Sequence, residues 1–158
     1  MIVKSKSLAD TDNLAKMFAK NIAGTGAFVC LYGEIGSGKT TFIKSLAKHL
    51  GVKENVTSPS FVILNEYHSG ALPIYHFDLY RLEDEGIKTI ADELSEYSEG
   101  KILTLIEWAQ FATVELPKNR IEITIKYIDD TTRMFEFKAE GENNTKMLKE
   151  TDSAYSHP

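Results

Sequence analysis

A glycine-rich run organises this chain: Gly33-Glu34-Ile35-Gly36-Ser37-Gly38-Lys39-Thr40, followed by Thr41. The run fits the pattern G-x-x-x-x-G-K-T, which is typical of loops that bind nucleotide phosphates. Its glycines allow the backbone to turn tightly, so that main-chain N–H groups can reach a phosphate. Lys39 adds a positive charge for the β- and γ-phosphates, and the Thr40 hydroxyl is suited to ligate Mg²⁺. We therefore predict that residues 34–41 bind a nucleotide.

The residues on both sides of this loop fit a strand that enters it and a helix that leaves it. Residues 27–32 form a short apolar run rich in strand-forming residues, as expected for a buried parallel strand. Apolar residues with helical spacing follow the loop, and Gly51 marks the end of that helix. The alternative, a glycine-rich turn that binds nothing, is disfavoured by these flanks.

Length and composition indicate one ordinary globular domain. The chain has 158 residues, of which 42% are hydrophobic and 26% are charged. A net charge of −5 argues against a large basic surface for nucleic acid. The single cysteine, Cys30, excludes an intrachain disulfide and fits a reducing compartment. Because no apolar run has the length of a membrane span and no signal peptide is recognisable, we expect a cytoplasmic protein.

The rest of the chain alternates between helical and strand patterns. A helix is predicted over residues 9–22, strands over 61–67, 74–77, 101–108, 120–127 and 133–138, and a polar helical region over 83–98. This order predicts an α/β, P-loop NTPase-like three-layer fold. Its central sheet is mixed and mostly parallel, with helices on both faces and an antiparallel C-terminal hairpin. We expect residues 1–140 to form this single domain, and residues 141–158 to be a polar tail with at most a short helix before disorder.

Two acidic residues each follow a predicted strand and are candidates for the catalytic site. Glu107 ends an apolar run and resembles the acid of a Walker B motif, with Glu in place of the usual Asp. Asp78 follows a shorter, more polar strand. We favour Glu107 as a ligand of Mg²⁺, with Asp78 orienting the attacking water or lying in the outer metal shell. The alternatives are a solvated acid at the end of a strand for Glu107 and a helix N-cap for Asp78. Which of them positions the water stays open.

Other polar and aromatic residues near this predicted site have two readings each. Trp108, the only tryptophan, either stacks on a base or covers the site, or is partly buried in a side pocket. Arg81 or Arg133 either stabilises phosphoryl transfer or forms a surface ion pair. Residues 58–60 are either a switch segment that senses the γ-phosphate or a plain turn. The four histidines share no ligand spacing, so we predict no structural metal, and we interpret His76 as a hydrogen-bonded strand residue.

Four segments together resemble the bacterial TsaE family, over residues 8–138. They are the phosphate loop up to Thr41, then Thr57-Ser58-Pro59-Ser60-Phe61, then Tyr75-His76-Phe77-Asp78-Leu79-Tyr80-Arg81-Leu82, then Leu105-Ile106-Glu107-Trp108. The loop is common to many unrelated proteins, whereas the last two segments at this separation are specific. The resemblance implies an ATPase needed for the N6-threonylcarbamoyl modification of adenosine next to the anticodon, in tRNAs that read codons beginning with A. Such a protein binds the TsaB–TsaD transferase pair and hydrolyses ATP to reset it between turnovers. It meets tRNA only through these partners. The sequence leaves the oligomeric state of the free protein open, and we expect a monomer because nothing in it demands more.

The resemblance also assigns roles to individual residues. It makes Lys39 and Thr40 the phosphate and Mg²⁺ residues, Glu107 the second metal-site acid, and Asp78 a residue needed for hydrolysis. It makes Trp108 a neighbour of the nucleotide, and Thr11 and Arg133 further nucleotide-site residues. The chain departs from the family pattern in having Ser60 in place of Thr and in lacking a proline after Trp108. Residues 83–99 follow the family pattern only loosely.

Three other functions use the same loop. A small-molecule kinase normally brings several arginines and a lid, whereas this chain has three arginines in all. A GTP-driven switch requires an Asn-Lys-x-Asp element, which the sequence lacks. A nucleotide-sensing module without turnover cannot be separated from a slow ATPase by sequence alone.

Overall fold

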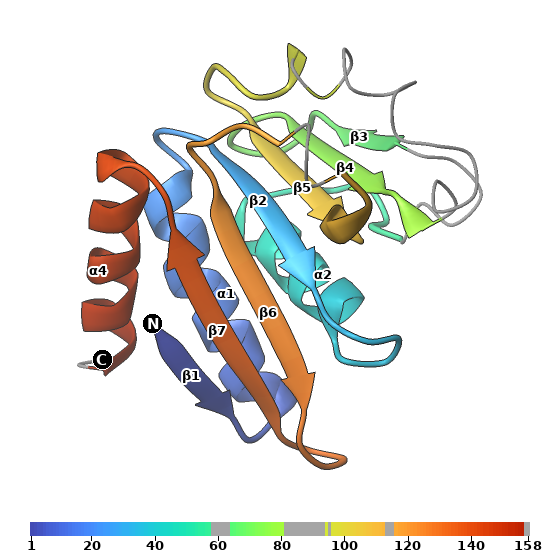
Figure 1. Cartoon of the computed structure of the whole chain (residues 1–158), viewed down its shortest axis with the longest axis vertical. Helices are drawn as coiled ribbons and strands as arrows, with labels where there is room; N and C mark the ends of the chain where they lie inside the picture. Colours follow the sequence, from blue (N-terminus) through green and yellow to red (C-terminus); the bar gives the residue numbers. More distant parts are fainter. Residues whose placement is uncertain (58–63, 81–93, 95, 113–115, 157–158) are drawn as a thin grey trace.

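The computed structural model of the chain describes residues 1–57, 64–80, 94, 96–112 and 116–156. Within these ranges the chain forms one seven-stranded sheet with helices packed against it (Figure 1). The elements are, in order, β1 (Ile2–Ser5), α1 (Leu8–Ile22), β2 (Ala27–Tyr32), α2 (Lys39–His49), β3 (Leu64–Tyr67), β4 (Ile74–Asp78), β5 (Leu103–Glu107), the 3-10 helix η3 (Ala109–Ala112), β6 (Ile121–Tyr127), β7 (Arg133–Ala139) and α4 (Glu142–Ser156). The predicted switch segment at residues 58–60, Arg81 and most of the predicted helical region over 83–98 lie outside the described residues.

The sheet is mixed, and its parallel part lies at the centre. The strand order is β1-β7-β6-β2-β5-β4-β3. The four middle strands β6, β2, β5 and β4 are parallel to one another, whereas β7 with β1 on one side and β3 on the other pair antiparallel. This arrangement confirms the predicted mixed α/β sheet and its C-terminal hairpin, β6–β7. The carboxyl ends of β2, β4 and β5 consequently meet at one edge of the sheet, where open α/β folds bind ligands.

The two faces of the sheet are covered differently. Figure 1 shows α1 and α2 against one face, with α4 beside α1 near β7. Buried side chains of these helices and of the strands form the larger hydrophobic core. The opposite face carries a smaller core, in which Phe77 and Ile106 of the sheet pack with Leu94 and with Ala109 of η3. Among the described residues, the α-helices with assigned bounds therefore contribute to one core, and η3 with Leu94 contributes to the other.

A group of phenylalanines fixes the position of α2 relative to the sheet. The Phe42 ring lies 5.4 Å from that of Phe135 and 6.4 Å from that of Phe18, measured between centroids. Phe18 in turn contacts Phe137 edge-on at 5.7 Å. All four side chains are almost completely buried. Because Phe42 comes three residues after Lys39, this packing also fixes the start of α2 and hence the end of the phosphate loop.

The C-terminal segment differs from the polar tail that we expected. It forms α4, a helix of 15 residues that packs against α1. Met147, Leu148 and Thr151 are buried in this contact, and Asn21 Nδ2 of α1 donates a 2.8 Å hydrogen bond to Thr151 Oγ1. The apolar stripe is narrow, so that the segment reads as polar although one side of the helix is buried. None of the helices in the described ranges combines the length and the apolar character needed to cross a lipid bilayer.

Candidate nucleotide site

The glycine-rich run is a loop that joins β2 to α2. Gly33, Gly36 and Gly38 have φ angles of +154°, +83° and +108°, in the region that favours glycine. At Gly33, a Cβ atom would lie 2.5 Å from Ser37 Oγ and 2.6 Å from the carbonyl oxygen of Ile125, so no larger residue fits. The N-terminus of α2 has no side-chain cap. Its first N–H groups therefore remain available to an anion, as in phosphate-binding loops.

The ammonium group of Lys39 lies at the mouth of this loop. Nζ donates hydrogen bonds to the carbonyl oxygens of Gly33 and Glu34, and it lies 4.2 Å from the centroid of the Trp108 ring. The side chain is largely buried. This burial lowers the pKa of Lys39, and the negative charges of Glu107, Asp78 and Glu34 oppose the shift. A phosphate group at this position would meet a cation that few water molecules can reach.

The two predicted acids face the same loop from neighbouring strands. Asp78 and Glu107 are register partners at the ends of the parallel strands β4 and β5. Glu107 is 3% exposed, and its Oε2 lies 2.7 Å from Nε2 of His76. Asp78 Oδ1 accepts a 3.0 Å hydrogen bond from the Tyr80 N–H, so this carboxylate also stabilises the turn that follows β4. The alternative of a solvated strand-end acid does not describe Glu107, because it is buried.

A cavity of about 320 Å³ lies between the loop and these acids. Its lining includes most of the residues predicted from the sequence: Glu34, Ile35, Gly36, Gly38, Lys39, Thr40, Thr41, Asp78, Glu107, Trp108 and Arg133. Ser37 is the exception within the loop. Its Oγ is buried and has no hydrogen-bond partner among the described residues. Ser37 thus belongs to the loop through its main chain, and its side chain packs behind Gly33.

A second cavity of about 470 Å³ adjoins the first one. The two share Gly38, Thr41 and Arg133, and the second is also lined by Thr11 and Leu8. Thr11 is the one predicted site residue that lies only here, with its Oγ1 2.7 Å from Ser5 Oγ. Sequence reasoning missed the other residues that line this cavity, because no local motif marks them: Lys6, Ser7, Leu8, Ala9, Asp130, Thr131 and Phe135.

Arg133 connects the C-terminal hairpin to the phosphate loop. Its Nε donates a 2.9 Å hydrogen bond to the carbonyl oxygen of Ser37, and its Nη1 donates to those of Asp129 and Thr132 at 2.6 and 3.0 Å. The guanidinium also lies over the Tyr127 ring, 4.6 Å from its centroid. These partners are carbonyl groups and a ring, so the guanidinium braces the loop while it lines both cavities.

Trp108 covers the phosphate side of the site. Its φ angle of +59° is unusual for a bulky residue, and in the described chain no other residue besides glycine has a positive φ. The ring packs against Tyr80, with 4.9 Å between centroids, and over Nζ of Lys39. This position agrees with a cover over the loop. Trp108 does not line the larger cavity next to Thr11.

The residues around the loop fit a magnesium ion. Thr40, Asp78 and Glu107 bring oxygen donors, which Mg²⁺ prefers, to one cavity. In the part of the chain that the structure describes, no three His, Cys, Asp or Glu side chains gather into a metal site of their own. Such a limited donor set is typical of magnesium held by one or two protein ligands together with phosphate and water oxygens.

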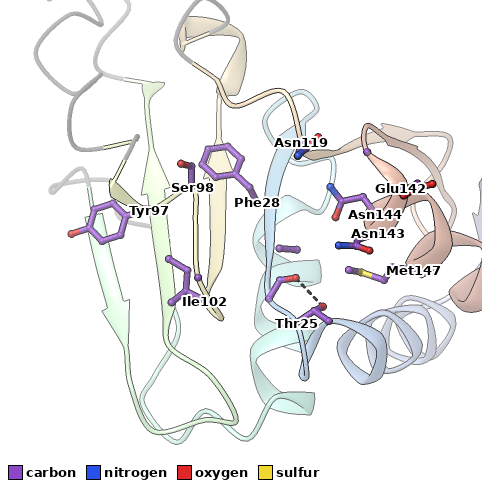
Figure 2. Close-up of a pocket in the computed structure, with 14 residues that line it drawn as sticks. Thr25, Phe28, Tyr97, Ser98, Ile102, Asn119, Glu142, Asn143, Asn144 and Met147 are labelled. Carbon is purple, nitrogen blue, oxygen red and sulfur yellow. Dashed lines mark hydrogen bonds between the residues drawn. The ribbon is translucent and has the colours of Figure 1, made fainter.

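A further pocket lies at the other end of β2 and differs in its chemistry. It has a volume of about 360 Å³, and Figure 2 shows Asn119, Asn143 and Asn144 on its walls. The described lining residues include one acid, Glu142, and neither lysine nor arginine. The pocket therefore lacks the positive charge that a nucleotide phosphate requires, and the candidate site remains at the loop.

Comparison with known proteins connects this geometry to a family. The sequence model described as "Threonylcarbamoyl adenosine biosynthesis protein TsaE" matches residues 5–135. The chain belongs to the TsaE family. This assignment confirms the resemblance found in the phosphate loop, the segment around Asp78 and the segment around Glu107.

Several members of the TsaE family are similar over most of their length. The tRNA threonylcarbamoyladenosine biosynthesis protein TsaE of Bacillus subtilis is 40% identical over 148 residues, which are 94% of this chain and 90% of that protein. The protein of the same name from Treponema pallidum is 35% identical over 82% of this chain and 93% of its own length. The crystal structure of Bacillus subtilis YdiB superposes with a TM-score of 0.80, at 32% identity, and covers 98% of this chain and 95% of that one.

Proposed function

We propose that this protein is the ATPase of tRNA threonylcarbamoyladenosine biosynthesis. In this role it binds ATP with Mg²⁺ and hydrolyses it while bound to the TsaB–TsaD pair, which returns the transferase to its starting state. The observation that carries the proposal is the convergence of Lys39, Thr40, Asp78 and Glu107 on one cavity next to the loop. Family membership supports the pathway, since the relatives are named for it.

The nucleotide is divided between the two adjoining cavities. The phosphates bind at the loop, where main-chain N–H groups and Lys39 neutralise their charge. The base and ribose bind in the cavity lined by Thr11 and Leu8, which shares Arg133 with the phosphate cavity. A cavity of about 470 Å³ is within the size range of pockets for such ligands.

The two acids have different tasks in hydrolysis. Thr40 and Glu107 hold Mg²⁺, which neutralises the negative charge that develops on the phosphate oxygens. Asp78, the register partner of Glu107, orients the attacking water. Trp108 limits the access of other water molecules to Lys39, because its ring lies over Nζ. In this proposal, water is the acceptor of the phosphoryl group.

Partners supply the contact with tRNA. The net charge of −5 disfavours direct binding of a polyanion by this chain. We therefore assign tRNA binding to the TsaB–TsaD pair and expect the free protein to be a cytoplasmic monomer. A kinase would need a second cationic site for its acceptor. In the described residues, Lys39 and Arg133 are the cations that line the phosphate cavity.

ATP hydrolysis by the purified protein, alone and with the TsaB–TsaD pair added, tests this function. We expect slow turnover alone and faster turnover with the pair. Lys39→Ala should abolish both, because it removes the cation at the loop. Lys44→Ala is the matched control, since Lys44 is exposed on the same helix. Phosphate transfer to a small acceptor, with no response to the pair, would overturn the proposal in favour of a kinase. Normal tRNA modification in cells that carry only Lys39→Ala would also overturn it.

A further inference from the structure

His76 is a buried side chain directly behind the candidate site. It lies on β4, two residues before Asp78 and on the same face of the sheet. Its register partner on β5 is Leu105, so Glu107 is the diagonal neighbour, two residues further along. The side chain has no exposed surface, and its Nε2 lies 2.7 Å from Glu107 Oε2. It does not line the cavity, whereas Glu107 does.

Packing alone does not account for a histidine at this position. Within the described part of the chain, the buried Nδ1 has no hydrogen-bond partner. A buried polar atom without a partner costs folding free energy that an apolar side chain would not. Among the described residues, the polar contact of the ring is with the carboxylate of Glu107. We therefore look for the role of His76 in its effect on Glu107.

The hydrogen bond orders the two oxygens of Glu107. Because Nδ1 has no acceptor among the residues that the structure describes, we assign the proton of a neutral ring to Nε2, which then donates to Oε2. This hydrogen bond occupies Oε2, and Glu107 lines the cavity, so Oε1 is the oxygen that we assign to a ligand there. A carboxylate held at one oxygen loses rotational freedom, and the other oxygen is presented in a defined direction. Such partners behind a metal ligand commonly orient it.

We propose that His76 is a positioning residue that holds Glu107 in the conformation required to bind Mg²⁺ with the nucleotide. The proposal rests on the proposed function, in which Glu107 is a magnesium ligand. It predicts that loss of the Nε2–H weakens the response to Mg²⁺ and leaves nucleotide binding without the metal unchanged. His76 itself does not line the cavity, so its effect would pass through Glu107.

The magnesium requirement of nucleotide binding is the decisive measurement. Trp108 is the single tryptophan and lies 4.2 Å from Lys39 Nζ, so its fluorescence reports on the site. ADP or ATP would be titrated at a series of Mg²⁺ concentrations with wild-type protein, His76→Leu and His76→Gln. We expect His76→Leu to raise the half-saturating Mg²⁺ concentration about 10- to 100-fold. His76→Gln keeps an N–H donor of similar reach and should restore most of the loss.

Thr104→Val controls for the general loss of a buried hydrogen bond. Thr104 is also buried on β5, but its hydroxyl donates to the carbonyl of Tyr97 at 2.7 Å and not to a site residue. This variant should lose stability and keep the wild-type magnesium requirement. If His76→Leu binds nucleotide with the wild-type magnesium requirement, the positioning role is wrong. If the wild-type protein shows no magnesium-dependent binding and no hydrolysis, the proposed function itself fails.

A second measurement does not depend on the folding of any variant. The ¹⁵N chemical shifts of the His76 ring in the wild-type protein distinguish the two tautomers of a neutral imidazole. We expect the proton on Nε2, and we expect this resonance to move when ADP and Mg²⁺ are added together but not with ADP alone. A neutral ring protonated on Nδ1 would overturn the proposal, because Nε2 would then not donate to Glu107.

Discussion

Arg133 Nε donates a 2.9 Å hydrogen bond to the carbonyl oxygen of Ser37, a residue 96 positions earlier in the chain. The same guanidinium donates to two carbonyl groups of the β6–β7 turn, those of Asp129 and Thr132. The phosphate loop is thus tied to a hairpin that the chain forms almost a hundred residues later. A substitution in the hairpin that breaks these hydrogen bonds should therefore change the affinity for nucleotide.

Arg133→Lys should lower nucleotide affinity although it keeps the positive charge. Lysine lacks the planar fork that bonds Ser37, Asp129 and Thr132 together, so the loop loses its brace. A hydrogen bond from a charged group contributes about 1.5–3 kcal/mol, which corresponds to about a 10- to 100-fold weaker affinity. Calorimetric titration with ADP measures it. Arg120→Lys is the control, since Arg120 bonds Glu122 and Pro117 away from the loop. Equal nucleotide affinity in both variants would contradict the role of Arg133 in holding the loop.

Glu107→Ala should bind nucleotide and fail to hydrolyse it. The substitution removes a proposed ligand of Mg²⁺ but leaves the loop and Lys39 intact. Nucleotide binding would be followed by calorimetry and turnover by phosphate release. Glu107→Gln is the companion variant, because it still accepts a hydrogen bond from His76 and therefore disturbs the buried pair less. Wild-type turnover in either variant would transfer the metal role to Asp78, the register partner.

Leu148→Ala should destabilise the whole fold, which separates a packed C-terminal helix from a polar tail. Leu148 is 7% exposed and belongs to the larger core together with α1. We expect the free energy of unfolding to fall by about 2 kcal/mol or more, as for other buried leucines. Urea denaturation measures the change, and Glu150→Ala, on the exposed side of α4, should have little effect. Two indistinguishable variants would mean that α4 does not contribute to the core.

The protein should lose stability in alkali partly through Cys30. Burial raises the pKa of this thiol from 9.0 to about 12. Between these values the unfolded chain releases a proton that the folded chain retains, so the free energy of unfolding falls as the pH rises. The neighbouring Tyr32 hydroxyl, whose pKa burial also raises, acts in the same direction above its ordinary value of 10.0.

Denaturation at pH 8 and pH 10.5 measures this alkaline loss, and Cys30→Ala should make it smaller by on the order of 1–2 kcal/mol. Thiol reagents should also label native Cys30 only as fast as the protein opens, since the side chain has no exposed surface. An unchanged pH dependence in Cys30→Ala, or immediate labelling of the native protein, would contradict the burial of this group.

Much of the candidate site could be predicted from the sequence because its chemistry is encoded locally. Glycines, a lysine and a threonine at fixed spacing define the phosphate loop, and the loop forms between β2 and α2 where the flanking patterns placed it. Glu107 and Asp78 were found for a similar reason. Each follows a predicted strand, and the carboxyl ends of parallel strands meet at one edge of a sheet.

Tertiary structure alone decided the contacts that depend on strand order and register. Pairing of β4 with β5 brings His76 against Glu107, and pairing of β6 with β7 brings Arg133 to Ser37. No local pattern contains either contact, because the partners lie 31 and 96 positions apart. The same holds for α4. Its narrow apolar stripe becomes buried only by packing against α1, which lies far away in the sequence. The sequence by itself determined the candidate phosphate-binding groups, since the spacing of residues within a loop is local. The fold determined which groups hold them in place, because packing between distant segments depends on the tertiary structure.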